Sequence, residues 1–232
     1  MDLKRYVPAA ILAAGLCLAV YFDIHKFLSL EVVSDNYGVL KNYIASDYVF
    51  SLLLFSITYI FIVAFSIPGA SILSLLFGAL LGTLVSGTLI VISATIGATF
   101  IFLAAKFALK GILKRRAGPW LLKMHAGFNE NALSYLLFLR LVPLFPFFVV
   151  NLVPAFMNVS LRLYIGTTFI GIIPGTFVYA SIGNGIGYIL EKGENPDLSI
   201  LSSTQIILPL AALGLLSLVP IVYKKLKGNR KV

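Results

Sequence analysis

Arg140 is the residue whose chemistry most needs an explanation in this sequence. It lies in the stretch Leu-Leu-Phe-Leu-Arg-Leu-Val-Pro at 136–143, with apolar neighbours on both sides. A charge at the centre of a membrane-spanning segment costs at least about 2.5 kcal/mol on insertion scales, so a guanidinium there requires a partner. The only acidic residue between Tyr48 and Leu190 is Glu130.

Two roles for Arg140 stay open. A guanidinium can bind a phosphate, such as that of a lipid headgroup, or the carbonyl groups that a helix break leaves free. It can instead extend to the cytoplasmic interface or pair with Glu130, and either would be a structural role.

The prolines that follow Arg140 predict a broken helix. Pro143, Pro146 and Pro154 interrupt the apolar segment 133–157, which is too short for two spans of about 20 residues each. Proline removes a backbone donor, and broken backbone is tolerated at membrane depth only where protein or a wet cavity covers it. We predict a hairpin that turns near 143–146. Asn151 then bonds either the unwound backbone or a neighbouring helix.

No motif of catalysis or metal binding is found in the sequence. His25 and His125 lack a cysteine or carboxylate at ligand spacing, and Cys17 is the only cysteine. A Walker glycine loop, a G-x-S-x-G elbow and paired carboxylates are all absent from the sequence. We expect no enzymatic activity, no metal site and no cofactor.

The composition predicts an all-α integral membrane protein. The chain has 232 residues, of which 59% are hydrophobic and 12% charged, and a soluble domain carries about twice that share of charge. Its long apolar runs do not alternate as membrane β-strands do, so a polytopic helical bundle is expected. The net charge of +9 comes from basic residues at segment ends, which indicates topology and anionic lipid rather than nucleic acid.

Charge and hydropathy divide the chain into an N-terminal part, a core and a C-terminal part. Basic residues place both termini and the central connector in the cytoplasm, and the short loops fit a bacterial plasma membrane. The expected N-terminal part is an anchor helix and outer loop (1–47). The expected core (48–190) contains the segment 48–86, which is either a hairpin that turns at 67–69 or two spans, followed by a span (87–109), a basic connector (110–132), a second hairpin (133–157) and a span (162–182). The C-terminal part (191–232) is expected to contain an outer loop, a final span (200–222) and a basic tail.

A weak internal similarity suggests a repeat. The stretch Ile-Gly-Ala-Thr-Phe-Ile-Phe at 96–102 resembles Ile-Pro-Gly-Thr-Phe-Val-Tyr at 173–179, which contains Pro174 and Gly175. On the expected topology the two units enter the membrane from opposite sides, as in an inverted repeat, and transporters place substrate sites between such broken elements. Chance similarity between glycine-rich membrane helices is the alternative.

Two further features concern lipid contact and packing. The connector carries basic residues beside the only tryptophan, a composition typical of a segment on an anionic membrane surface. Gly78 and Gly82 have the spacing of closely packed membrane helices. The basic and aromatic residues are Lys114, Arg115, Arg116 and Trp120.

Together these motifs resemble the DedA-like superfamily, also called the SNARE-associated or VTT domain. Ile-Pro-Gly at 67–69 and Leu-Phe-Gly-Ala-Leu-Leu-Gly at 76–82 are similar to its first signature. The stretch 138–146, Asn151 and Gly-Ile-Ile-Pro-Gly-Thr at 171–176 are similar to its second. The Arg-x-x-Pro-x-x-Pro spacing is nearest to the Tvp-type branch.

The resemblance covers roughly 48–189 and implies two re-entrant hairpins in an inverted arrangement. It also implies movement of phospholipid or polyprenyl-phosphate headgroups between leaflets, or a role in membrane homeostasis. Several branches carry acidic residues in the first hairpin, linked to proton coupling, and this sequence has none between 48 and 109, so passive scrambling is favoured. By matching, the first motif comprises Pro68, Gly69, Gly78 and Gly82, and the second Arg140, Pro143, Pro146, Asn151 and Pro174.

Three functions compete at this point. A lipid scramblase or flippase would bind membrane lipids, especially those with anionic or phosphate-bearing headgroups. A secondary transporter of a small ion or solute would use the same hairpins, although the missing membrane acids count against it. A membrane scaffold would have no need of unwound backbone. A homo-oligomer is compatible with all three.

Overall fold

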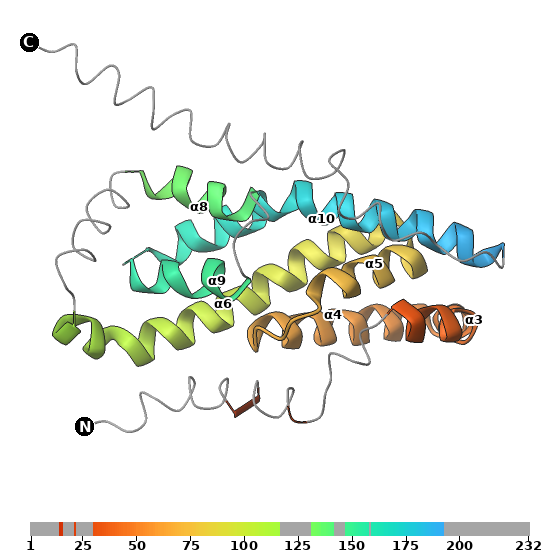
Figure 1. Cartoon of the computed structure of the whole chain (residues 1–232), viewed down its shortest axis with the longest axis horizontal. Helices are drawn as coiled ribbons and strands as arrows, with labels where there is room; N and C mark the ends of the chain where they lie inside the picture. The colour runs from red at the N-terminus through yellow and green to blue at the C-terminus, as the bar shows by residue number, and fades with distance from the viewer. Residues whose placement is uncertain are drawn as a thin grey trace, which may run out of the picture.

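The computed structural model describes residues 14–15, 21, 30–116, 131–141, 147–157 and 159–192. Every secondary-structure element within these ranges is a helix, as the sequence predicts (Figure 1). The helices are α3 (Leu30–Ser46), α4 (Tyr48–Ala64), α5 (Ala70–Leu81), α6 (Thr83–Arg116), α8 (Ala132–Leu141), α9 (Phe147–Phe156) and α10 (Leu161–Glu191).

The break between α4 and α5 falls at the predicted position. Pro68 cannot continue a helix, and the chain turns through Ser66 and Gly69, whose φ angles are 52° and 120°. A φ of 120° is one that side-chain-bearing residues rarely adopt, so glycine suits the position before α5. Gly82, with a φ of 77°, ends α5 in the same way and leads into α6.

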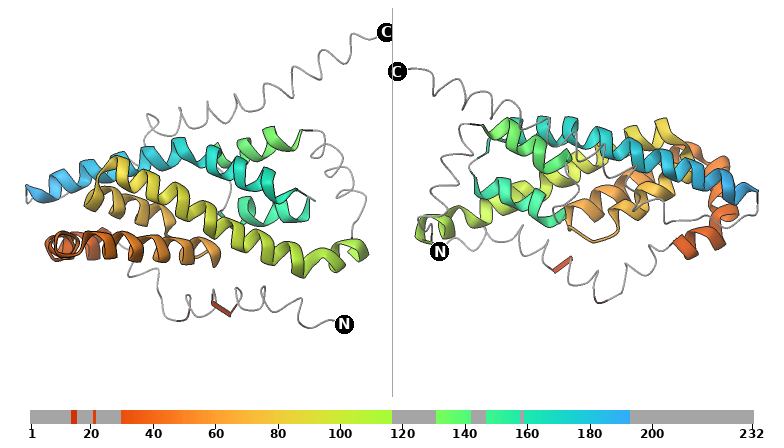
Figure 2. Two further views of the ribbon diagram at one scale, coloured as in Figure 1. Left: turned by 180° about the vertical axis from the view of Figure 1, so that it is seen from behind. Right: turned by 45° about the horizontal axis from the view of Figure 1, so that its top comes forward.

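The helices form two sets, α4–α6 and α8–α10, and each set has one short helix between two others. The short helix of each set packs against the long helix of the other set, an arrangement that we call the exchange of short helices. In the first set α4 packs on α6, and in the second α8 packs on α10. The short helix α5 packs against α10, whereas the short helix α9 packs against α6. The two long helices α6 and α10 also contact each other and form the centre of the bundle (Figures 1 and 2).

The core between these helices contains large side chains from both sets. Phe77 of α5, Phe102 of α6 and Tyr164 of α10 are buried in one cluster with Tyr59 and Leu136. The ring of Phe102 stacks on that of Tyr164, with centroids 4.1 Å apart. The two halves therefore share one hydrophobic core.

The outward faces are apolar, as a membrane protein requires. Val49, Leu53, Ile57 and Phe61 recur every four residues along α4 and are all exposed, so they form one stripe on the helix surface. Residues 83–107 of α6 and the whole of α10 are long and apolar enough to cross a bilayer. The bent pair of α3 and α4 would supply a third span if it is counted as one.

Three elements differ from the expected segments. Helix α6 continues through 110–116, the start of the predicted connector, and α10 continues past 182 to Glu191. Residues 30–46, expected in an outer loop, form α3, which meets α4 at a bend of 119°. The predicted anchor helix, apart from residues 14, 15 and 21, and the predicted final span lie outside the described residues.

Candidate functional site

Arg140 lies in the last turn of α8 and reaches two other helices. Its Nη1 donates to Oδ1 of Asn151 in α9 at 2.8 Å. Its Nη2 donates to the hydroxyl of Tyr164 at 2.8 Å and to Oγ1 of Thr168 at 2.9 Å, both in α10. One guanidinium thus joins the helices on either side of the predicted break to α10. We call these four residues the Arg140 cluster.

The acceptors of Arg140 are enclosed by protein. Asn151 and Tyr164 are fully buried, and Thr168 is 1% exposed. Tyr164 links the cluster to α6, because its hydroxyl donates a hydrogen bond to the carbonyl oxygen of Ala98 at 3.2 Å. All five participating groups are polar in an otherwise apolar bundle, so they form an internal polar seam between α6, α8, α9 and α10.

The described partners of Arg140 are all neutral. Carboxamide and hydroxyl oxygens accept its hydrogen bonds, so the cluster keeps the positive charge of the guanidinium. Within the described residues the buried Nδ2 of Asn151 has no hydrogen-bond partner. A buried donor without an acceptor is rare and costly in a folded protein. Because this free N–H donor lies next to the guanidinium of Arg140, the two groups together favour binding of an anion.

A glycine lets α8 approach α10 closely enough for these bonds. A Cβ atom added at Gly171 would lie 2.7 Å from Cβ of Arg140. Gly97 has the equivalent role in the first set, where an added Cβ would lie 2.7 Å from the carbonyl oxygen of Ile60. In both sets a glycine of the long helix faces the helix that precedes the break.

A model of the VTT domain matches residues 67–185, which is about half of the chain. The chain belongs to the VTT domain family. It is 35% identical to Transmembrane protein 41 homolog of Dictyostelium discoideum over 88% of this chain and 60% of that protein. Its identity to Transmembrane protein 41B is 28% in Mus musculus and 29% in Homo sapiens, over 81% of this chain and 63% of each relative.

These comparisons confirm the family resemblance and the assignment as an integral membrane protein. The chain spans about three fifths of the length of the curated relatives that it matches. The Tvp-type branch stays a prediction. No solved structure gives a significant match.

The structure brings together two of the residues that the VTT signatures single out. Arg140 and Asn151 are hydrogen-bonded, as described above. Pro174 and Gly175 lie in α10 beyond Thr168, and no atom lies within 4 Å of a Cβ added at Gly175. Six residues of helix place Pro174 about 9 Å along α10 from Thr168, so it does not belong to the Arg140 cluster.

The remaining predicted residues have separate places. A Cβ added at Gly78 would lie 2.3 Å from the carbonyl oxygen of Ala180, which fits the predicted packing role. Gly82 differs, because it ends α5 and has no close neighbour; its nearest is Asn184 at 3.7 Å. Pro68 and Gly69 form the turn before α5. Lys114, Arg115 and Arg116 are the last residues of α6, while Pro143, Pro146 and Trp120 lie outside the described residues.

Tyr164 and Thr168 are site residues that the sequence analysis did not single out. They are spaced by four in one helix, so both side chains lie on the same face. A hydroxyl pair at this spacing, within a long apolar segment that follows the arginine, is the signal that could have indicated them.

Proposed function

We propose that this chain moves phosphate-bearing lipid headgroups between membrane leaflets, as a scramblase or flippase does. The observation that carries the proposal is the Arg140 cluster, in which a guanidinium within the apolar bundle has neutral described partners. A phosphate passing the seam would find this cation and the unpartnered amide nitrogen of Asn151.

The energetics support a transient anion site. A charge in a membrane helix costs about 2.5–3.5 kcal/mol on insertion scales. Hydrogen bonds to a charged group contribute about 1.5–3 kcal/mol each, so three neutral acceptors hold Arg140 in place. They do not neutralise it, because none carries a negative charge. The guanidinium therefore attracts a phosphate without a carboxylate to displace.

The exchange of short helices supports a pathway between the two sets. We treat α4–α6 and α8–α10 as an inverted repeat whose broken elements re-enter the membrane. Each short helix then packs against the long helix of the other set, as α5 does on α10 and α9 on α6. Substrate sites of inverted-repeat transporters lie where such broken helices meet.

The proposed movement is passive, as in a scramblase, and not energy-driven, as in a flippase. Glu130 is the only acidic residue between 48 and 190, so the core has no series of carboxylates that would carry protons. The proposal includes a bacterial plasma membrane with both termini in the cytoplasm, where the basic end of α6 would contact anionic headgroups.

Leaflet exchange in liposomes tests this function. The purified full chain is reconstituted with fluorescent phospholipid, and a membrane-impermeant quencher is added outside. We expect quenching to pass the half that protein-free vesicles show. Arg140→Gln should slow the exchange, and Arg162→Gln, at an exposed position of α10, should not.

Two results would contradict the proposal. Quenching that stops at half with folded wild-type protein would exclude lipid exchange. A solute-dependent flux of protons or sodium ions, with no lipid exchange, would support secondary transport instead.

A further inference from the structure

A second polar site lies at the other end of α10. A cavity of about 570 Å³ opens between α3, the C-terminal end of α5 and the C-terminal end of α10. It is large enough for a headgroup, since ligand pockets have volumes of about 300–1,000 Å³. We call it the α3 pocket; the polar and glycine residues that matter here are Tyr37, Lys41, Asn184, Gly185, Tyr188 and Glu191.

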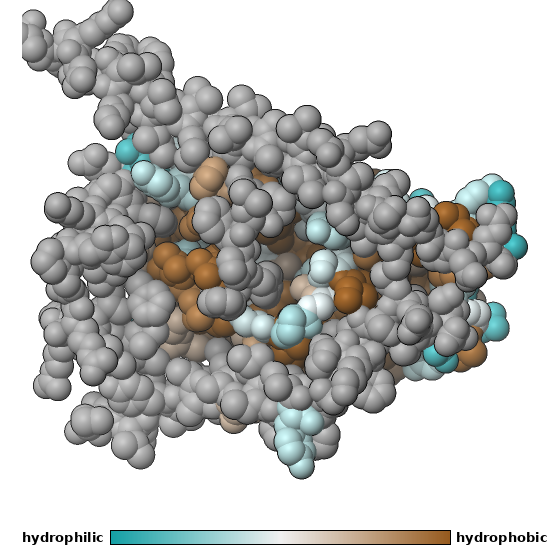
Figure 3. Space-filling view, viewed as in Figure 1, coloured by the Kyte–Doolittle hydropathy of each residue, from teal (hydrophilic) through white to brown (hydrophobic). Residues whose placement is uncertain are grey.

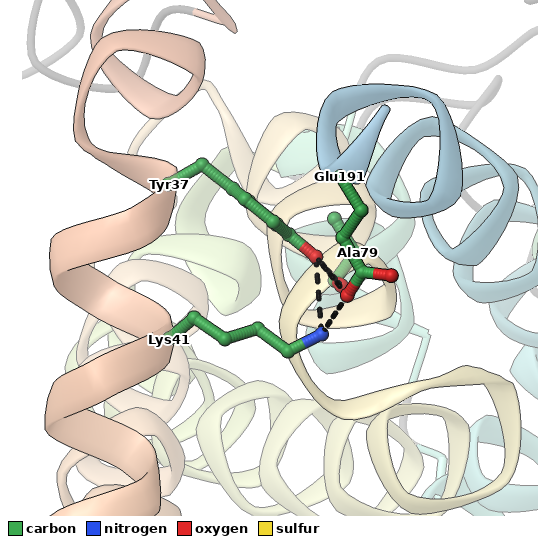
Figure 4. A network of polar contacts seen from close by, with 4 residues as sticks. All are labelled: Tyr37, Lys41, Ala79 and Glu191. Carbon is green, nitrogen blue, oxygen red and sulfur yellow. Dashed lines mark hydrogen bonds and ion pairs between the residues drawn. The ribbon is translucent and has the colours of Figure 1, made fainter. Parts of the chain in front are cut away.

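The α3 pocket contains one positive and one negative group. The Lys41 ammonium pairs with the Glu191 carboxylate, so the contact joins α3 to α10 (Figure 4). The hydroxyl of Tyr37 lies 3.3 Å from Nζ of Lys41 and 3.1 Å from the carbonyl oxygen of Ala79, to which it donates. Figure 4 shows all three side chains converging above the end of α5.

The two charges are accessible to a ligand. The side chains of Lys41 and Glu191 are 45% and 49% exposed. An exposed ion pair contributes only about 0–1 kcal/mol, so exchanging each partner for a ligand group costs little. A ligand with one charge would satisfy one side chain and leave the other unpaired. A ligand with both charges satisfies both.

The position of the α3 pocket fits a lipid headgroup. Twenty residues of α10 separate Tyr164 from Asn184, which corresponds to about 30 Å of helix and to the thickness of a hydrocarbon core. The Arg140 cluster and the α3 pocket therefore lie near opposite ends of one spanning helix. Hydrophilic residues lie beside hydrophobic ones at the end of the molecule that holds α3 and the end of α10 (Figure 3). Tyr188, 61% exposed, is of a type enriched at the headgroup level.

We propose that the α3 pocket binds a zwitterionic lipid headgroup that carries both a phosphate and an ammonium group. Lys41 pairs with the phosphate, and Glu191 pairs with the ammonium. This inference rests on the proposed function and deepens it, because it names a headgroup class and a second site, in the leaflet opposite the Arg140 cluster.

Gly185 offers a direct way to block the pocket. No atom lies within 4 Å of a Cβ added there, so a side chain can leave the backbone at Gly185 without a clash. Gly185→Leu therefore adds bulk at the lining of the pocket. Gly166→Leu is the matched control, because Gly166 is in the same helix, equally open and outside the pocket lining. Leucine favours a helix over glycine, so neither variant should unfold the protein.

Binding is measured separately from exchange. The full chain in detergent is titrated with short-chain phosphatidylethanolamine and with phosphatidylglycerol, which lacks the ammonium group, and bound lipid is counted by native mass spectrometry. We expect preference for phosphatidylethanolamine, weakened about tenfold, or 1.4 kcal/mol, by Gly185→Leu and unchanged by Gly166→Leu. Glu191→Gln should abolish the preference.

Each failure has a distinct meaning. Equal binding by both leucine variants, or an undiminished preference in Glu191→Gln, would overturn the headgroup assignment of the α3 pocket. Preferential binding that Gly185→Leu weakens, in a protein that does not exchange lipid in liposomes, would overturn the proposed function while the pocket assignment stands.

Discussion

Replacing Arg140 by leucine and by lysine separates the contribution of its charge from that of its shape. Leucine removes the cation and all three described hydrogen bonds. Lysine keeps the charge, but an ammonium is a point charge and does not reproduce the planar fork that reaches α9 and α10 together.

The expected magnitudes follow from the number of bonds lost. Three bonds to a charged group contribute roughly 5–9 kcal/mol in total. Removing the charge from a membrane helix returns about 2.5–3.5 kcal/mol, so Arg140→Leu should lower the free energy of unfolding by roughly 1.5–6.5 kcal/mol. Arg140→Lys loses at least one bond and should lower it by about 1.5–3 kcal/mol.

Two measurements on the same preparations test this reasoning. Unfolding in mixed micelles of increasing denaturing detergent gives the loss of stability, and the liposome assay gives the exchange rate of the folded protein. We expect Arg140→Lys to retain more exchange than Arg140→Leu. A lysine keeps the positive charge that attracts a phosphate, and this attraction matters more for exchange than the planar geometry of the guanidinium. Arg162→Leu, at an exposed position, is the control for removing a cation from the protein.

Equal effects of the two substitutions on exchange would refute the role of the charge. Folded Arg140→Leu that exchanges lipid at the wild-type rate would remove Arg140 from the mechanism altogether. In that case the cluster would be a structural joint between α8, α9 and α10.

Three further predictions concern packing, the ion pair and topology. Gly183→Ala should lower the free energy of unfolding by about 1–3 kcal/mol, because its Cβ would lie 2.1 Å from a carbonyl oxygen of α5; Gly166→Ala, in open space, should not, and equal stabilities would contradict this contact. Lys41→Ala should change the stability by less than about 1 kcal/mol, measured by the same unfolding, and a larger loss would mean that the pair fixes α3. Lys192→Cys in a Cys17→Ala background should react with an impermeant maleimide in intact cells, because the expected topology places the end of α10 outside. Labelling only after the membrane is opened would mean that this end faces the cytoplasm.

The sequence predicted the features that depend on local chemistry. Pro68 and Gly69 indicate a break before α5. Proline has no backbone N–H to donate, and glycine readily adopts the positive φ found at Gly69. Arg140 and Asn151 stood out as polar residues in an apolar segment, and the structure joins them. Gly78 was identified as a packing residue by its spacing and lies against Ala180.

Other features depend on contacts that the sequence does not specify. Tyr164 and Thr168 become site residues only because Gly171 brings α10 against α8. Segment 30–46 read as a polar loop, yet Tyr37 and Ile44, seven residues apart, bury one face of α3 against α5. Gly82 had the spacing of a packing glycine, whereas its φ of 77° makes it the end of α5.

The exchange of short helices constrains how this protein is made. Helix α5 has only 12 residues, too few to cross a bilayer, and its glycine face fits against α10. Its partner at Ala180 is synthesised about a hundred residues after Gly78. Until α10 is made, α5 can contact α3, α4 and α6, but the face that contains Gly78 lacks the surface on which it packs in the folded protein. Assembly of this bundle is therefore completed from its C-terminal side, and a chain truncated before α10 leaves the first set of helices without its closing surface.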